Sequence, residues 1–138
     1  MRLHISSLSV RYGKLSALRD ITASADGGKI VCVLGPNASG KSTLLRCIAG
    51  LQAPTRGKVL FDGASLLRLH PRERASKVVW VPRTSEVGGR FTLRQVVELG
   101  RYALGPSPAR VDDALATVDL FDRAETIWHE ASAGMKQR

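Results

Sequence analysis

The chain has 138 residues, a length that fits about one domain. With 43% hydrophobic and 24% charged residues, its composition is close to the globular average, which favours neither an intrinsically disordered chain nor a disulfide scaffold. Apolar runs such as Ile30–Leu34 are far shorter than the ~20 residues of a membrane span, and the first residues lack the apolar stretch of a signal peptide. We therefore expect a soluble, intracellular protein.

The charge is strongly basic, with 21 Lys and Arg against 12 Asp and Glu and a formal net charge of +9. Residues 1–105 carry 17 basic and 6 acidic side chains, whereas residues 106–138 carry 4 and 6. Such a surface favours nucleotides, nucleic acid or an anionic membrane face as partners, although a solvated basic face would have the same composition. Because there is no run of five or six basic residues, a nucleic-acid-binding tail is not indicated.

The two cysteines lie among apolar residues, in Val31-Cys32-Val33 and Leu44-Leu45-Arg46-Cys47-Ile48. Neither has a CxxC partner or a histidine at metal-ligand spacing. We expect both to be small apolar core residues of a protein in a reducing compartment.

Strand patterns open the chain. Leu3–Val10 and Ala17–Ala25 are predicted as strands, the second ending at the turn signal Asp26-Gly27-Gly28. Ile30–Leu34 has no alternation, and its unbroken apolar, mostly β-branched residues predict a strand covered on both faces, as in a parallel sheet.

The apolar period becomes helical after the glycine-rich stretch 35–40, which predicts a helix that begins near Lys41 and ends at Gly50. Further along, Thr92 is the predicted N-cap of another helix. The remaining predicted elements are strands at Lys58–Phe61 and Val78–Val81 and a helix carrying the apolar stripe Val111, Ala114, Leu115 and Val118. This order predicts an α/β core with a helical insertion.

The segment 35–43 fits the phosphate-loop pattern G-x-x-x-x-G-K-[ST] and lies between an apolar strand and an apolar-periodic helix. Its glycines let backbone N–H groups converge on phosphate oxygens at the positive end of the helix dipole. Lys41 is predicted to reach the β- and γ-phosphates, and Ser42 to offer its hydroxyl to Mg²⁺. The predicted ATP-binding residues of this loop are Gly35, Pro36, Asn37, Ala38, Ser39, Gly40, Lys41, Ser42 and Thr43.

Nearly the whole chain resembles the nucleotide-binding domain of ABC transporters. The resemblance is carried by the phosphate loop, by the start Leu8-Ser9-Val10-Arg11-Tyr12-Gly13, and by the end Ser132-Ala133-Gly134-Met135-Lys136-Gln137-Arg138, which is similar to the family signature S-G-G-x-x-Q-R. It implies an α/β fold: a P-loop NTPase core of the ABC ATPase type with N-terminal antiparallel strands and a helical subdomain. Residues 1–82 would form the core with the loop, and residues 83–138 a Q-loop-like segment, the helical subdomain and the signature.

The resemblance also implies roles for residues outside the loop. Tyr12 would stack on adenine, which suits its aromatic face. The signature residues Ser132, Ala133, Gly134 and Gln137 would contact the γ-phosphate bound by a second ATPase subunit. Two positions depart from the family: Ala133 replaces a glycine, and Arg83 replaces the Q-loop glutamine. Arg83 could contact phosphate but cannot ligate a metal, because guanidinium has no acceptor.

The family continues beyond its signature into a strand that ends in an acidic pair, and then to a switch histidine. This sequence has no apolar strand leading into Asp-Glu, and His4, His70 and His129 all precede the signature. We therefore expect the N-terminal portion of an ABC ATPase domain, with the C-terminal part of its core missing. Ile30–Leu34 would then keep an exposed apolar edge. No catalytic residue is assigned, and we expect weak Mg·ATP binding with negligible hydrolysis.

The resemblance leaves three functions to compare. The first is the ATPase subunit of an importer, and the segment Phe91–Tyr102 is similar to the branch that serves iron-siderophore, haem and cobalamin. Its partners would be an integral-membrane permease, a second ATPase subunit and, indirectly, a substrate-binding protein, with the chain in the cytoplasm on the inner face of the cell membrane.

The second function is a nucleotide-binding fragment or regulator without hydrolysis. The third, nucleic-acid binding, would show as salt-sensitive retention that ATP does not compete.

Overall fold

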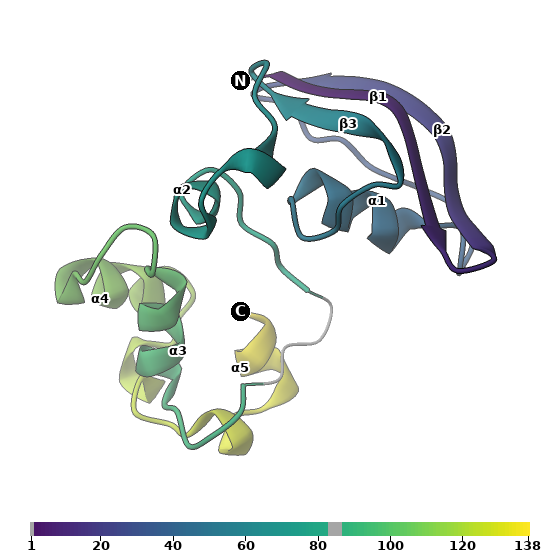
Figure 1. The fold of residues 1–138 in the computed structure, drawn as a ribbon. Helices are drawn as coiled ribbons and strands as arrows, with labels where there is room; N and C mark the ends of the chain where they lie inside the picture. The colour runs from purple at the N-terminus through teal and green to yellow at the C-terminus, as the bar shows by residue number, and fades with distance from the viewer. Residues whose placement is uncertain (1, 83–86) are drawn as a thin grey trace. The chain divides into compact units, whose positions relative to one another are not determined.

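The computed structural model describes residues 2–82 and 87–138, so the predicted Q-loop position Arg83 lies outside the described residues. The chain divides into two compact units, Met1–Trp80 and Val81–Arg138 (Figure 1). No helix in the described part of the chain is long and apolar enough to cross a membrane.

The first unit is built on a three-stranded antiparallel sheet in the order β2-β1-β3 (Figure 1). Its strands are β1 (Arg2–Tyr12), β2 (Leu15–Asp26) and β3 (Arg56–Phe61), which confirms three of the predicted strands. The register places His4 of the central strand opposite Ser24 of β2 and Leu60 of β3. Register shifts in the middle of β1 mark bulges that bend the strand.

Helix α1 (Lys41–Ile48) packs against one face of this sheet (Figure 1). Cys47 is its buried residue, and Leu44 and Ile48 lie half-buried beside it, whereas Leu45 is 40% exposed. The other buried members of this core are Ile5, Leu8, Val10, Leu18 and Val59. The prediction that Cys47 is a core residue is therefore confirmed.

Two predicted strands are not formed. Ile30–Leu34 and Val78–Val81 have no strand structure, and their apolar side chains are largely exposed, with Ile30 at 96% and Leu34 at 90%. The physical reason is that a strand needs a neighbour for its backbone groups, and no described strand pairs with either segment. The same exposure makes the prediction of a core position wrong for Cys32.

Short helices complete the first unit after β3. These are the 3-10 turn η1 (Leu66–Arg68) and helix α2 (Pro71–Ala75). His70 caps α2 by accepting the N–H of Arg72 on its ring nitrogen Nδ1, at 3.4 Å. His70 therefore has a local structural role at a helix end.

The second unit is helical. Its helices are α3 (Leu93–Gly100), α4 (Pro108–Thr117) and α5 (Ala133–Gln137), with the 3-10 turns η2 (Phe121–Arg123) and η3 (Trp128–Glu130). Thr92 is the N-cap of α3, as predicted: its hydroxyl accepts the N–H of Gln95 at 3.3 Å, and the Gln95 side chain accepts the N–H of Thr92 at 2.9 Å.

The core of the second unit joins α3, α4 and the C-terminal turns. The predicted stripe on α4 supplies Val111 and Leu115, whereas Ala114 is exposed. The other buried members are Leu93, Leu120, Ala124, Trp128 and Ala131.

An ion-pair cluster ties α3 to the rest of the second unit. The guanidinium of Arg94 donates from Nη1 to Asp112 on α4 and from Nε to Glu125, at 2.9 Å to the latter. The hydrogen bond to Asp112, followed by that to Glu125, raises the pKa of Arg94. Arg94 therefore stays charged at any working pH, and its charge is matched inside the unit.

Candidate functional site

The second glycine of the phosphate loop, Gly40, is required by the fold. Gly40, the N-cap of α1, has a φ of 91°, in the left-handed region that favours glycine. A Cβ at this position would lie 2.5 Å from the carbonyl oxygen of Ala17 and 2.8 Å from Leu18 Cδ2. The loop thus closes directly against β2, and any side chain here would push it away from the sheet.

The backbone of the loop presents a set of free donors. One turn is closed by the N–H of Ser39, which donates to Pro36 at 3.3 Å. Within the described parts of the chain, no acceptor pairs with the N–H groups of Asn37, Ala38, Gly40, Lys41, Ser42 and Thr43. The last three are the unpaired amides that begin every α-helix, where the dipole is positive. The loop is therefore a cluster of donors suited to an anion.

The side chain of Lys41 folds back onto the loop. Its ammonium donates to the carbonyl oxygens of Gly35 at 2.8 Å and Pro36 at 2.6 Å. These carbonyls hold a full positive charge beside the free amides, with no carboxylate competing for it in the described residues. The Lys41 ammonium is therefore held beside the unpaired N–H groups of the loop.

Ser42 lies one residue after Lys41 in the first turn of α1 and is exposed. Its hydroxyl has no hydrogen-bond partner among the described residues. The described residues also contain no group of three or more His, Cys, Asp and Glu that could hold a metal ion. A lone hydroxyl fits Mg²⁺ that arrives with phosphate and water ligands, and does not fit a permanent protein-bound metal.

Tyr12, the predicted adenine-stacking residue, is the last residue of β1 in the same unit as the loop. It is 44% exposed, and its hydroxyl lies 3.5 Å from Oε1 of Gln52. Because the Tyr12 ring is partly exposed and is held at its hydroxyl end, one face of the ring can stack on a planar ligand. Gln52 carries no sequence signal, because the contact spans 40 residues.

The predicted signature residues all lie in the second unit, around the start of α5. The hydroxyl of Ser132 accepts the N–H of Met135 at 3.2 Å, so this residue caps the helix. Ala133, Gly134 and Gln137 are exposed. Met135 packs on the core of the second unit, which fixes the helix start while the three exposed residues face solvent.

The structure brings Tyr12 and the loop residues 35–43 into one unit and leaves the signature residues in the other. The polar cluster around Arg94 was not anticipated from the sequence. Its partners lie 18 and 31 residues away, and no local pattern pairs them.

Comparison with known proteins identifies the family. The family profile described as "ABC transporter" matches residues 18–138. The hemin import ATP-binding protein HmuV of Rhizobium meliloti is 34% identical over 99% of this chain and 53% of its own length. The cobalamin import protein BtuD of Halobacterium salinarum is 36% identical, over 100% of this chain and 36% of its own length. The sulfate/thiosulfate import protein CysA of Neisseria meningitidis is 35% identical over 100% and 40%.

Solved structures agree in fold. An ATP binding subunit of an ABC transporter is 30% identical, with a TM-score of 0.85 over 99% of this chain and 58% of that one. An ATP-bound bacterial Atm1-family ABC exporter reaches a TM-score of 0.84 over 99% of this chain at 23% identity, a level that shows the fold alone. The chain thus spans about a third to a half of the curated relatives named here and has the P-loop fold of ABC ATPases. It belongs to the ABC transporter family.

Proposed function

We propose that the chain binds the phosphates of ATP at the loop 35–43. The observation that carries this proposal is the combination of unpaired backbone N–H groups and the Lys41 ammonium at the start of α1. The amide N–H groups would donate to the oxygens of the phosphate tail, and Lys41 would exchange its two carbonyl partners for the β- and γ-phosphates. The net gain comes from pairing a cation with an anion in place of neutral carbonyls.

Mg²⁺ is part of the proposed ligand. When it is bound with the nucleotide, the ion neutralises charge between the terminal phosphates. The hydroxyl of Ser42 would be its one protein ligand from the loop. Because the described residues hold no cluster of metal ligands, we expect Mg²⁺ to bind only together with nucleotide.

Two further contacts belong to the same proposal. Tyr12 would stack its exposed ring on the adenine. The start of α5, with Ser132, Ala133, Gly134 and Gln137, would contact the nucleotide held by a second subunit. Ala133, where the family has glycine, adds a Cβ to that contact surface, which makes the approach of backbone to phosphate longer there. Arg83, a cation in the Q-loop position, would contact phosphate and not metal.

For the whole protein we propose ATP hydrolysis that drives import of a solute through a membrane permease. Residues 1–82 would be the nucleotide-binding part, and residues 83–138 the helical part with the signature. Iron-siderophore, haem or cobalamin are the solutes we favour, since the relatives include hemin and cobalamin import proteins, although a sulfate import protein is equally similar. A second ATPase subunit, a permease, a substrate-binding protein and a place on the inner membrane face complete this proposal.

A non-hydrolysing nucleotide-binding module is the second candidate. It makes the same phosphate contacts at the loop 35–43 and differs from the first candidate only in phosphate release. For the 138-residue chain as given, we expect Mg·ATP binding without measurable phosphate release.

The test compares two lysine variants by isothermal titration with Mg·ATP. Lys41→Ala removes the ammonium at the loop and should weaken binding by about 10- to 100-fold, the worth of hydrogen bonds to a charged group. Lys14→Ala removes the same charge from the exposed turn between β1 and β2 and should leave the affinity within about twofold.

Two results would contradict the proposal. Equal affinities of the wild-type chain and Lys41→Ala, on material with unchanged circular dichroism, would show that the loop does not hold the nucleotide. Phosphate release by the wild-type chain that Lys41→Ala abolishes would instead exclude the non-hydrolysing candidate.

A further inference from the structure

A second recessed surface of the first unit lies away from the phosphate loop. It is a cavity of about 630 Å³ alongside β3, lined by residues that run from Pro54 to Leu69. No residue of the loop 35–43 lines it. Its volume is within the range of about 300–1,000 Å³ that is usual for ligand pockets. We call this surface, made by β3 and the segment through η1, the β3 groove.

The backbone along the β3 groove is an open sheet edge. Among the described strands β3 is the outer member next to β1. Phe61 exchanges both backbone hydrogen bonds with Ala64, at 2.8 and 2.9 Å, so its N–H and C=O face away from β1. Because backbone direction alternates along an antiparallel pair, the N–H and C=O of Val59 face the same way. Nothing described pairs with Val59 on that side, and such groups attract another strand.

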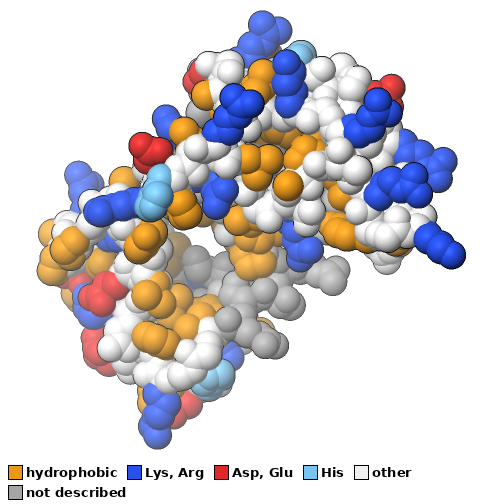
Figure 2. All heavy atoms as spheres, in the orientation of Figure 1, with side chains coloured by type: hydrophobic (Ala, Val, Ile, Leu, Met, Phe, Trp, Pro, Cys, Tyr) orange, Lys and Arg blue, Asp and Glu red, His pale blue; other side chains and the backbone are white. Residues whose placement is uncertain are grey.

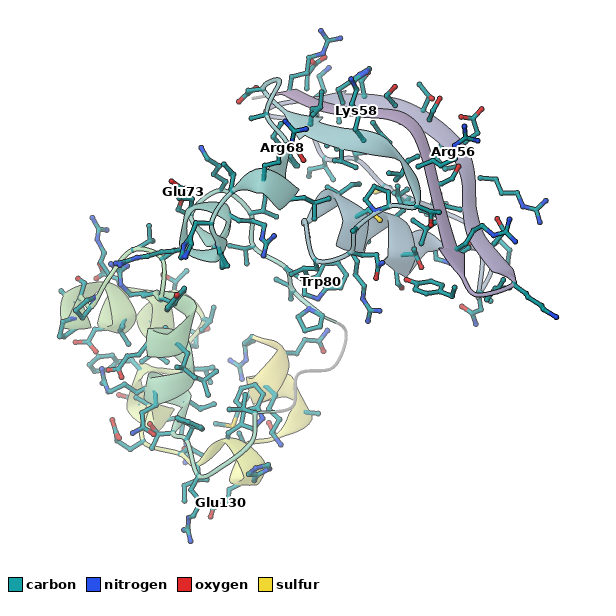
Figure 3. All side chains as sticks on the ribbon, viewed as in Figure 1. Arg56, Lys58, Arg68, Glu73, Trp80 and Glu130 are labelled. Atoms are coloured by element: carbon teal, nitrogen blue, oxygen red, sulfur yellow. The ribbon has the colours of Figure 1, made fainter. Side chains whose placement is uncertain are left out.

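Two cations flank this edge. Lys58 of β3 and Arg68 of η1 both line the groove and are exposed (Figure 3). Neither charged side chain has an ion-pair or hydrogen-bond partner among the described residues. Between them the wall is apolar, with Leu60 and Leu69 half-buried. The groove therefore combines backbone donors and acceptors, apolar wall and positive charge.

The charge of the whole unit has the same sign. Residues 1–80 contain 13 basic and 4 acidic side chains, whereas residues 81–138 contain 8 of each. Figure 2 shows Lys and Arg side chains gathered on the first unit, and acidic and basic side chains side by side on the second. A partner of the β3 groove must therefore bring negative charge.

We propose that the β3 groove binds an extended acidic peptide segment of a partner protein, which adds to the edge of β3 as a strand. The backbone of the segment pairs with Val59, and its carboxylates, on the face of the sheet that Lys58 shares with Leu60, face Lys58 and Arg68. Its alternate apolar side chains lie on the opposite face, beside Val59. An anionic lipid headgroup could satisfy the two cations but offers no row of alternating donors and acceptors to the sheet edge. The open backbone is the observation that favours a peptide.

The test uses the full 138-residue chain and fluorescent peptides about eight residues long. One peptide alternates Glu with Val and Ile, a second replaces Glu by Lys, and a third keeps the acidic sequence with every second backbone nitrogen methylated. We expect saturable binding of the first peptide alone, because the second has the wrong charge and the third cannot donate its hydrogen bonds to the edge.

Charge-reversal variants locate the binding surface. Lys58→Glu/Arg68→Glu should weaken binding of the acidic peptide by at least about tenfold and abolish its salt dependence. Lys14→Glu/Lys29→Glu makes the same change of net charge at exposed residues outside the groove and should change the affinity by less than about threefold. Unchanged affinity for Mg·ATP in both variants shows that the unit stays folded.

Three outcomes would overturn the proposal. Equal binding of the methylated and unmodified acidic peptides would show charge attraction without strand pairing. Equal loss in the two double variants would show attraction to the whole basic unit. Retention of the chain on vesicles of anionic phospholipid, lost in Lys58→Glu/Arg68→Glu and unaffected by excess acidic peptide, would assign the groove to a membrane surface.

Discussion

The two units of the chain use their charges in opposite ways. The second unit contains eight basic and eight acidic side chains, and Arg94 is bound between carboxylates of α4 and of the segment after η2. In the first unit the basic side chains outnumber the acidic ones by nine, and the ammonium of Lys41 is held only by backbone carbonyls.

This difference indicates which of the two cations, Lys41 or Arg94, can bind an anionic ligand. A cation that already contacts carboxylates has little to gain from an anionic ligand, whereas a cation held by neutral oxygens gains the full interaction. The charge of Arg94 therefore serves the packing of the second unit, whereas the charge of Lys41 is available to a ligand.

The largest effects should come from one leucine in each core. Leu8 in the first unit and Leu115 in the second are both fully buried. Replacing either by alanine removes buried methyl groups and leaves a cavity, which should lower the free energy of unfolding by about 2–5 kcal/mol. Urea unfolding followed by circular dichroism measures this loss.

The two leucine variants should differ in nucleotide binding. At low urea Leu115→Ala should keep the Mg·ATP affinity of the wild-type chain, because its cavity lies in the core of the second unit. Leu8→Ala loosens the sheet against which α1 packs and should weaken that affinity. The reverse order would show that the first unit is not the one that binds nucleotide.

The two cysteines of the first unit differ in burial and should differ in reactivity. Cys32 is exposed in the unpaired segment 30–34, whereas Cys47 is buried in the core, and burial raises the pKa of its thiol. We expect iodoacetamide to modify Cys32 at least about 100-fold faster, since Cys47 reacts only after an opening that costs about 3 kcal/mol. Mass spectrometry of the labelled peptides measures both rates.

The raised pKa of Cys47 also gives a pH dependence. A thiol with a higher pKa in the folded state than in the unfolded state contributes stability below its unfolded pKa, and this contribution is lost as the pH rises above it. Stability should therefore fall above pH about 9, and Cys47→Ala should remove that part of the fall. Equal labelling rates of the two cysteines at neutral pH would contradict the packing of α1.

The smallest effect should come from a helix cap of the second unit. Thr92 accepts a hydrogen bond from the backbone at the start of α3, whereas Ser107, the N-cap of α4, makes no such bond. Thr92→Ala should cost about 1 kcal/mol of unfolding free energy, and Ser107→Ala clearly less. Urea unfolding of the two variants side by side measures the difference. Equal costs would mean that the capping box of Thr92 and Gln95 contributes nothing.

Features that depend on neighbours in sequence could be predicted from the sequence. The strands of the first sheet, the start of α1 and the cap at Thr92 follow from alternation, glycine conformation and side-chain hydrogen bonds over a few residues. The phosphate loop is of the same kind, because its glycines and Lys41 act within nine residues.

Features that need distant partners could not be predicted in this way. Ile30–Leu34 has the composition of a strand covered on both faces, yet no described strand pairs with its backbone and the predicted strand does not form. The contact of Arg94 with Asp112 and Glu125, and the open edge at Val59, arise only once the helices and strands have packed.

The family, the phosphate loop and most local elements could therefore be inferred from the amino-acid sequence, because these features depend on the order of residue types along a short stretch. Which cations are already paired and which sheet edge is open became known only from the folded structure. These outcomes depend on contacts between residues far apart in the chain, where the entropy of closing a long loop must be offset by packing and hydrogen bonds that a local pattern does not contain.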